Sequence, residues 1–156
     1  MNTHNMNINI KYLNDKAVQP TKTHDRDFCY DCVATSCEDL GNGYYRYGLG
    51  FAMQFSDEDI KTYQLNGFVL SFSLKPRSSV WKTGMILTNC IGVGDEDYTG
   101  EYQAVFYHLD KSKPKYEVGD RVLQFNVEIT PQLGFIEVEE LRTTKRGDGG
   151  YGSTGL

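Results

Sequence analysis

The sequence predicts an all-β fold, a sandwich or a barrel, and three observations predict it. Short segments of alternating or continuous apolar residues recur along most of the chain, and turn residues separate them at short intervals. The 11 Tyr and 8 Phe residues favour strands, in which aromatic side chains are enriched. The chain has 156 residues, of which 39 % are hydrophobic, and this suits one domain with a modest core.

The first expected strand is NINIKYL at 7–13, where polar and apolar residues alternate with a period of two. Pro20 ends the linker that follows it. Further strands are expected at 27–34, 44–55, 67–74, 84–93, 100–109, 120–129 and 135–141. Between two of them, Ser56 and the acidic residues after it predict a short capped helix at 56–64.

Charge and hydropathy exclude several classes of function. Lys and Arg number 16 against 21 Asp and Glu, and the net charge of −5 argues against broad binding to nucleic acid or to an anionic membrane. The first residues lack a basic region followed by an apolar core, and no run of about 18 apolar residues occurs. We therefore expect a cytoplasmic location, and any phosphate ligand must meet a local cluster of positive charge.

The cysteines leave two alternatives to weigh. Cys29, Cys32, Cys37 and Cys90 could form two disulfides by number, but without a secretion signal reduced thiols are expected. His24 with the first three cysteines has a spacing that a zinc site could use. Against zinc, Cys29 and Cys32 would point to opposite faces of a strand, and no second CxxC supports them.

The last residues, RTTKRGDGGYGSTGL at 142–156, combine glycines with a cation, a ring and hydroxyls. Taken alone, such a tail is typical of disorder or of a linker. Arg146, Tyr151, Ser153 and Thr154 nevertheless stand on a backbone that can wrap an anion closely. No Walker P-loop motif is present. We therefore expect a β domain at 1–141 and a flexible Gly-rich C-terminal arm at 142–156 that acts on a site built elsewhere.

Other segments carry polar groups next to expected strands. KPRSSV at 75–80 places an arginine and two serines after a strand that Pro76 ends. A glycine-rich hairpin brings bare backbone amides beside Asp95, Asp97 and Tyr98. VGDRVLQF at 118–125 makes a Gly-Asp turn into a strand on which Gln124 faces the opposite way from Leu123. Each segment alone is compatible with an ordinary solvated turn.

Taken in order, these segments resemble the motifs of the trimeric dUTPase family, the dUTP pyrophosphatases. The matching segments are DFCYDCVA with Asp31, PRSS, the stretch from Asn89 through GVGDEDYTGE, GDRVLQ, and RGDGGYGSTG. The resemblance covers the chain from about residue 8 to the end. It implies a jelly-roll β-barrel, the β-clip fold, and a homotrimer in which each site gathers motifs from three chains.

The sequence departs from the family pattern at several positions. Gly94 precedes Asp95 where the family usually has an aliphatic residue, so a looser backbone is expected there. Ser79 replaces a common glycine, two cysteines stand in the first motif, and Tyr151 replaces the usual phenylalanine. The segment SDEDIKTYQLN is longer than the family's connection.

The resemblance implies hydrolysis of dUTP to dUMP and pyrophosphate, a reaction that keeps uracil out of DNA and supplies dUMP for thymidylate synthesis. Asp95 would orient and deprotonate the attacking water. Mg²⁺ would be held mainly by substrate phosphates and by waters that Asp31 orders. The residues implied at the phosphates are Arg77, Ser78, Ser79 and Gln124 near the metal, and Arg146, Gly152, Ser153 and Thr154 on the arm.

The resemblance also implies how the base and sugar are selected. Asn89 and backbone amides of the hairpin, at Gly92, Val93 and Gly94, would pair with uracil and leave no room for the methyl group of thymine. Tyr98 under the sugar would reject a 2′-hydroxyl, and Tyr151 would close over the base.

Two alternatives remain open at this point. A dCTP deaminase shares the fold and an RSS segment, but it uses a glutamate where this sequence has Val105. A regulator could bind dUTP and a protein partner without turnover, with a regulatory surface on the 56–66 segment. Pyrophosphate release from dUTP distinguishes the three.

Overall fold

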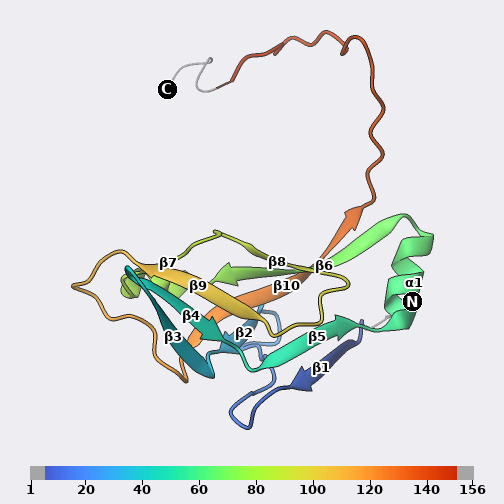
Figure 1. The fold of residues 1–156 in the computed structure, drawn as a ribbon. Helices are drawn as coiled ribbons and strands as arrows, with labels where there is room; N and C mark the ends of the chain where they lie inside the picture. The colour runs from blue at the N-terminus through green and yellow to red at the C-terminus, as the bar shows by residue number, and fades with distance from the viewer. Residues whose placement is uncertain (1–5, 151–156) are drawn as a thin grey trace.

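The computed structural model describes residues 6–150, and these form three antiparallel sheets, one helix and one 3₁₀ turn (Figure 1). The elements are β1 (Ile8–Tyr12), β2 (Tyr30–Val33), β3 (Ser36–Gly41), β4 (Tyr44–Gly48), β5 (Phe51–Phe55), α1 (Asp57–Leu65), β6 (Phe68–Pro76), η1 (Ser78–Lys82), β7 (Met85–Leu87), β8 (Gly92–Asp95), β9 (Gln103–His108) and β10 (Arg121–Pro131). The sheet orders are β1-β5, β2-β10-β6-β8 and β3-β4-β9-β7. The predicted all-β architecture is confirmed.

The core draws residues from all three sheets and is rich in aromatic rings. Phe72 on β6 is fully buried and stacks on Phe55, with ring centroids 4.2 Å apart. Tyr102 and Phe125 meet the same ring edge-on, each at 5.7 Å. Because Phe72 pairs with Gly94 across β6 and β8, this packing also supports the strand that ends at Asp95.

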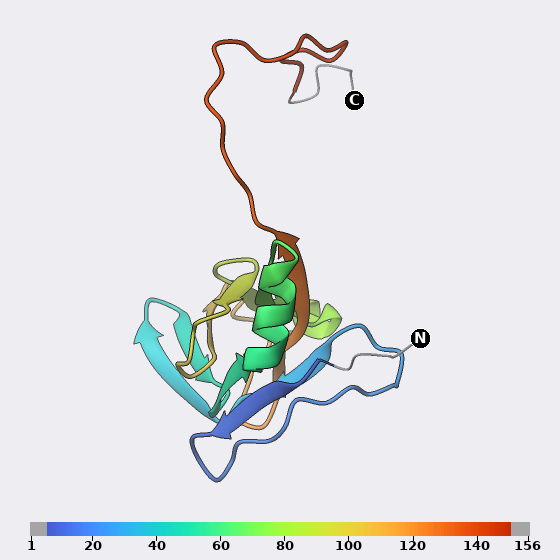
Figure 2. The same ribbon diagram turned by 90° about the vertical axis from the view of Figure 1, so that its right-hand side faces the viewer.

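The predicted helix is confirmed as α1, and its N-terminal cap anchors the first strand. The Ser56 side chain accepts a hydrogen bond from the Asp59 backbone N–H at 3.1 Å, as an N-cap does. The Asp59 carboxylate is 1 % exposed and accepts from the Asn7 backbone N–H at 3.0 Å. This links α1 to the residues just before β1, and Figure 2 shows both elements on one side of the molecule.

Two predicted strands are each divided in the structure. The segment 44–55 turns at Gly50, whose φ of +72° suits glycine, so β4 and β5 belong to different sheets. The segment 84–93 is interrupted by a turn at 88–91, in which Cys90 has a φ of +60°. At Gly50 apolar residues continue on both sides of the turn, so periodicity alone hides that break.

The predicted strand at 135–141 is wrong within this chain. Within residues 6–150 the segment pairs with no strand, and Phe135 is 93 % exposed. The chain leaves the sheets after β10 and runs away from them (Figures 1 and 2). The structure also contains β3, which sequence analysis did not predict because its SCEDLG residues are mainly polar and lie at a sheet edge.

Two further observations concern thiols and hydropathy. All four cysteines are free thiols, and burial in the core raises the pKa of Cys32 above its usual range. Within residues 6–150, no helix is long and apolar enough to cross a membrane.

Candidate functional site

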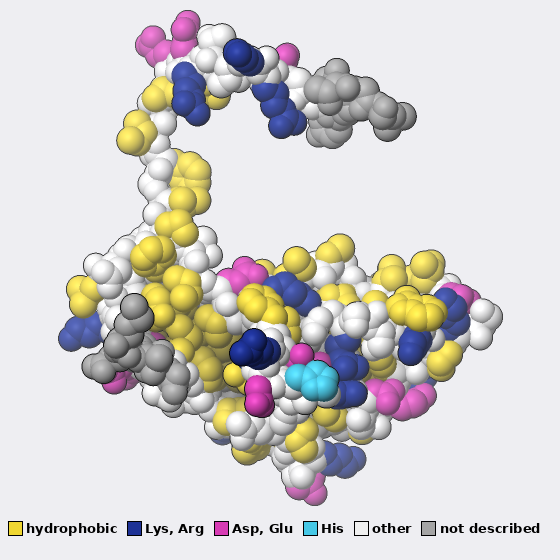
Figure 3. Space-filling view, turned by 180° about the vertical axis from the view of Figure 1, so that it is seen from behind, with side chains coloured by type: hydrophobic (Ala, Val, Ile, Leu, Met, Phe, Trp, Pro, Cys, Tyr) yellow, Lys and Arg dark blue, Asp and Glu magenta, His cyan; other side chains and the backbone are white. Residues whose placement is uncertain are grey.

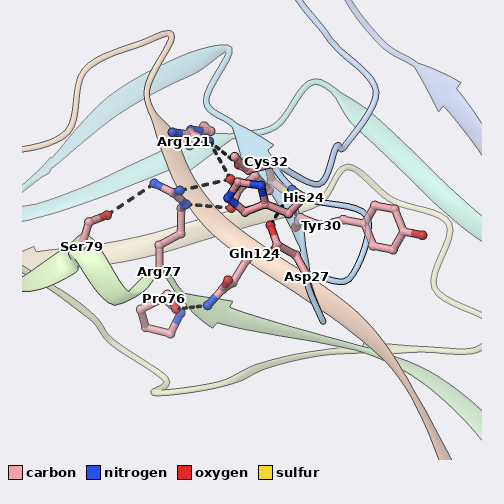
Figure 4. A network of polar contacts seen from close by, with 11 residues as sticks. His24, Asp27, Tyr30, Cys32, Pro76, Arg77, Ser79, Arg121 and Gln124 are labelled. Atoms are coloured by element: carbon pink, nitrogen blue, oxygen red, sulfur yellow. Dashed lines mark hydrogen bonds and ion pairs between the residues drawn. The ribbon is translucent and has the colours of Figure 1, made fainter.

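Sequence-predicted phosphate residues meet around one carboxylate at the junction of β2, β6 and β10. We call this group the Asp31 cluster; it consists of Asp31, Arg77, Ser79, Arg121 and Gln124 (Figure 4). Asp31 lies on β2, Arg77 follows β6, and Arg121 and Gln124 lie on β10. The cluster therefore joins three segments that are distant in sequence.

Arg77 donates two hydrogen bonds to the carboxylate of Asp31. Its Nε donates to Oδ1 at 2.7 Å and its Nη2 donates to Oδ2 at 3.1 Å, which is the bidentate geometry that fixes both side chains. Arg121 Nη1 donates to the same Oδ2 at 2.9 Å and to Thr23 Oγ1 at 3.2 Å. One carboxylate thus faces two guanidinium groups, and the excess positive charge favours an anionic ligand.

A β-bulge brings Arg121 and Gln124 to the same partner. Residues three apart on a regular strand point to opposite faces, but the β10–β2 register shifts between Arg121 and Leu123. Gln124 then pairs opposite Asp31, and its Nε2 donates to the Pro76 carbonyl at 2.9 Å. Arg121 was not among the predicted site residues. Its positive charge in the GDRVLQ segment, three residues before Gln124, could have indicated a phosphate contact.

The two serines of the PRSS segment begin the turn beyond β6. Arg77 is the residue before η1, and Ser78 opens it. Arg77 Nη1 lies 3.4 Å from Ser79 Oγ, so Ser79 belongs to the edge of the cluster. Lys and Arg side chains also gather across the middle of the face shown in Figure 3.

The sequence-predicted base and sugar residues line a separate hollow of about 220 Å³. The predicted residues that line it are Asn89, Gly92, Val93, Gly94, Asp95 and Tyr98, together with Leu74, Glu101, Tyr102 and Gln103. The hollow is open to solvent, and it combines backbone groups of β8, a carboxylate and a tyrosine ring. This inventory suits a flat polar ring attached to a sugar.

Strand pairing and a tight turn position the groups of the hollow. β8 pairs with β6 from Ser71 opposite Asp95 to Leu74 opposite Gly92. The Tyr98 backbone N–H donates to the Asp95 carbonyl at 3.0 Å, which closes the turn after β8. The Tyr98 hydroxyl donates to the Glu101 carbonyl at 2.9 Å. The ring is therefore held at both ends of the turn.

Glu96, the neighbour of Asp95, connects the hollow to α1. Its carboxylate accepts from Gln64 Nε2 at 2.8 Å and from the Leu70 backbone N–H at 3.2 Å. Helix α1, which lies in the segment that is longer than the family's usual connection, thus supports the loop that carries Asp95 and Tyr98.

Among the described arm residues, Arg146 contacts neither group. Arg146 is exposed, and its Nε donates to the Gly149 carbonyl at 2.9 Å within the arm itself. Tyr151, Gly152, Ser153 and Thr154 lie outside the described residues. The roles expected for these residues stay predictions.

Comparison with known proteins shows which family has a similar sequence. A sequence model described as dUTPase matches residues 66–155. Among curated relatives, the deoxyuridine 5′-triphosphate nucleotidohydrolase of Corynebacterium glutamicum is 33 % identical over 95 % of this chain and 94 % of its own length. The enzyme of the same name from Yarrowia lipolytica is 29 % identical over 97 % of this chain and 90 % of its own length.

Other relatives match over a shorter region. The alignment with the Finegoldia magna enzyme of the same name is 39 % identical over 53 % of this chain, and it spans 58 % of that relative's length. The chain therefore spans little more than half of the length of the Finegoldia magna relative. The solved dUTPase of Staphylococcus bacteriophage 80alpha, a G164S mutant with dUpNHpp, has a TM-score of 0.76 at 19 % identity, covering 96 % of this chain and 99 % of that one. This likeness confirms the predicted dUTPase-like jelly-roll fold, and with the family match it establishes that the chain belongs to the dUTPase family.

Proposed function

We propose that this protein hydrolyses dUTP to dUMP and pyrophosphate as a dUTP diphosphatase. The observation that carries the proposal is the hollow, where Asn89, Asp95 and Tyr98 converge on β8 and the turn after it. Uracil would pair with Asn89 and with the amides of Gly92, Val93 and Gly94, and Tyr98 would pack under the deoxyribose. The dUTP analogue named with the phage 80alpha enzyme supports this choice of substrate.

Catalysis needs a base, charge neutralisation and correct orientation. Asp95 would take the proton of a water aimed at the α-phosphorus, and the neighbouring turn would hold its backbone. The Asp31 cluster would bind the phosphates through its excess guanidinium charge. The residues that would contact the phosphates near the metal are Arg77, Ser78, Ser79 and Gln124. Arg146, Gly152, Ser153 and Thr154 would hold the γ-phosphate, and Tyr151 would cover the base.

Magnesium would enter with the substrate, and Asp31 suits a supporting role for it. A carboxylate offers about four acceptor positions. Among residues 6–150, Oδ1 of Asp31 accepts from Arg77 Nε, and Oδ2 accepts from Arg77 Nη2 and Arg121 Nη1. A second acceptor position on Oδ1 would then serve a metal-bound water. The phage phi11 dUTPase, 18 % identical, carries a structural Mg(II) ion. Bound magnesium would neutralise phosphate charge during the attack.

The distance between the two groups of residues supports an oligomer with shared sites. Asp95 pairs with Ser71 near the middle of β6, whereas Arg77 follows its end. About six extended residues separate Ser71 from Arg77, and at about 3.3 Å each this places Asp95 and Arg77 about 20 Å apart. An arginine side chain does not span that distance, so Arg77 and Asp95 of one chain would not meet directly. A homotrimer in which neighbouring chains complete each site would bring both kinds of residue to one triphosphate.

The first test is an assay of pyrophosphate release from dUTP with Mg²⁺. The proposed enzyme releases pyrophosphate and dUMP. A deaminase would instead produce ammonia from dCTP, and a regulator without turnover would bind dUTP but release neither product. Absence of pyrophosphate with correctly folded oligomer would reject the proposed function.

Tyr98→Ala should relax sugar selection. Without the ring, the space under the sugar opens, and the ratio of kcat/KM for UTP to that for dUTP should rise roughly tenfold. Tyr44→Ala is the matched control because Tyr44 is also a half-exposed tyrosine, 42 % against 44 % for Tyr98, and it packs on Tyr107 away from the hollow. An unchanged ratio in Tyr98→Ala would assign the ring another role. The wild type should not use dTTP or dCTP.

Arg121→Ala should weaken substrate binding more than turnover. The change removes one guanidinium and leaves Asp31 neutralised by Arg77 alone, so the KM for dUTP should rise roughly tenfold while kcat changes less than about threefold. Arg46→Ala is the control, since Arg46 pairs with Glu38 on the sheet edge, Nη1 to Oε2 at 3.2 Å. Equal KM values in the two variants would remove Arg121 from the phosphate site.

A further inference from the structure

Tyr102 fills the space next to the backbone of Gly94. A Cβ atom built on Gly94 would lie 2.5 Å from the Tyr102 hydroxyl oxygen and 2.6 Å from its Cε1. Real Cβ atoms essentially never make contacts that short, so any side chain at position 94 would have to displace the ring. Gly94 is not among the glycines with positive φ, and its backbone alone would accept another residue. The glycine is required by the tyrosine, not by the chain conformation.

The same ring supports Tyr98 from below. The two rings meet edge to face, with centroids 5.3 Å apart and planes at 89°. Tyr102 is 3 % exposed, and its ring also meets Phe72 and Phe51 in the core. A Cβ at Gly100 would approach the Tyr98 hydroxyl to 2.5 Å, so the Gly100 backbone also lies directly against Tyr98. Tyr102 thus limits the positions that the Tyr98 ring can take.

The hydroxyl of Tyr102 has no hydrogen-bond partner among residues 6–150, although it is buried. An unpaired buried hydroxyl costs stability, and phenylalanine would fill the same volume without that cost. Burial, with Tyr98 and Asp95 close by, raises the pKa of Tyr102 above its usual range, so the group stays neutral. The contact with Tyr98 is made by the ring, and the ring carbon Cε1 also blocks the space at Gly94 at 2.6 Å, next to the hydroxyl oxygen.

We propose that Tyr102 is a positioning residue that sets the discrimination between dUTP and UTP, by fixing the Gly94–Asp95 backbone on one side and the Tyr98 ring on the other. The proposal rests on the proposed function, because it concerns the same hollow. It also revises the expectation of a looser backbone at Gly94, because a buried ring replaces the missing side chain.

Substitutions that enlarge residue 94 and shorten residue 102, separately and together, test this proposal. Tyr102→Val removes support from Tyr98, and Gly94→Ile drives the ring from its position. Each change should raise the UTP to dUTP ratio of kcat/KM roughly tenfold. In the double variant Gly94→Ile/Tyr102→Val the isoleucine can occupy the space that the ring leaves, and the ratio should return to within about threefold of wild type, which is a coupling that independent sites lack. Gly94→Ala is a milder form of the same clash and serves if a larger change prevents folding.

Two controls separate positioning from general loss of core packing. Tyr102→Phe keeps the ring, and its ratio should stay within about threefold of wild type. Tyr116→Val removes another buried tyrosine, one that packs on Tyr47 and Phe106 instead. It should lower the melting temperature as Tyr102→Val does, but leave the ratio unchanged. Phosphate contacts cancel in this ratio because both nucleotides carry the same triphosphate.

The outcomes distinguish the inference from the proposed function. A wild type that does not hydrolyse dUTP rejects the proposed function itself. A wild type that hydrolyses dUTP and excludes UTP, with Tyr102→Val and Gly94→Ala equally selective, overturns only the role of Tyr102. A loss of selectivity in Tyr102→Phe as large as in Tyr102→Val would assign the effect to the hydroxyl and reject positioning by the ring.

Discussion

Asp95→Asn should lower kcat for dUTP hydrolysis by at least about 100-fold while dUTP still binds. The side chain lies at the exposed end of β8, where pairing with Ser71 and the turn to Tyr98 hold the backbone. Asparagine keeps the shape and the hydrogen bonds of that turn, but it cannot accept the proton of the attacking water. The loss should therefore appear in the chemical step and not in the affinity.

The measurement pairs steady-state kinetics with direct binding of dUTP or a non-hydrolysable analogue by calorimetry. Asp97→Asn is the matched control, since Asp97 is an exposed carboxylate in the same turn but does not line the hollow. It should stay within about threefold of wild type in both measurements. Wild-type turnover by Asp95→Asn would exclude Asp95 as the base, and equal losses in the two variants would indicate a general effect of charge.

Sequence analysis located the parts of the site that are local in the chain. Asn89, Asp95 and Tyr98 occur within one short stretch of residues, and their proximity follows from it. The predicted hairpin itself is wrong, because β8 pairs with β6 whereas β9 belongs to the other four-stranded sheet. Arg121 and Tyr102 could not be found in this way. The contact of Arg121 with Asp31 joins residues 90 positions apart and depends on a bulge in β10. The fit of Tyr102 to Gly94 depends on side-chain packing, which periodicity does not describe.

The fold shows the same division between local and distant information. The period of two located β1, and the capping pattern located α1, because both signals are local. The edge strand β3 was missed because its residues are mainly polar, and the segment 135–141 was predicted as a strand because its residues alternate. An alternating pattern indicates that a face is suited to burial, but it does not say which partner buries it. Within the described chain no strand pairs with 135–141.

Deleting residues 142–156 should abolish dUTP turnover while leaving the fold and the oligomer nearly unchanged. From residue 142 to 148 the arm is exposed, so its removal takes little buried area from the domain. The melting temperature should shift by no more than a few degrees. Activity should fall at least about 100-fold, because Arg146 and the proposed lid residue Tyr151 are lost together. A truncated protein with normal turnover would show that the arm has no part in catalysis.

A mixing experiment then decides whether the arm acts on its own chain's site. Arm-deleted chains, which keep Asp95, are combined with full-length Asp95→Asn chains, which keep the arm, under conditions that exchange subunits. If Asp95 and the arm of one site come from different chains, some mixed oligomers hold a complete site, and activity returns from two inactive parents. Each parent exchanged with itself is the control and should stay inactive. If one chain supplies both parts, no mixture can rebuild a site. Mixed oligomers, verified by native mass spectrometry, that stay inactive would therefore reject action between chains, even though the arm runs away from its own domain in this structure (Figure 1).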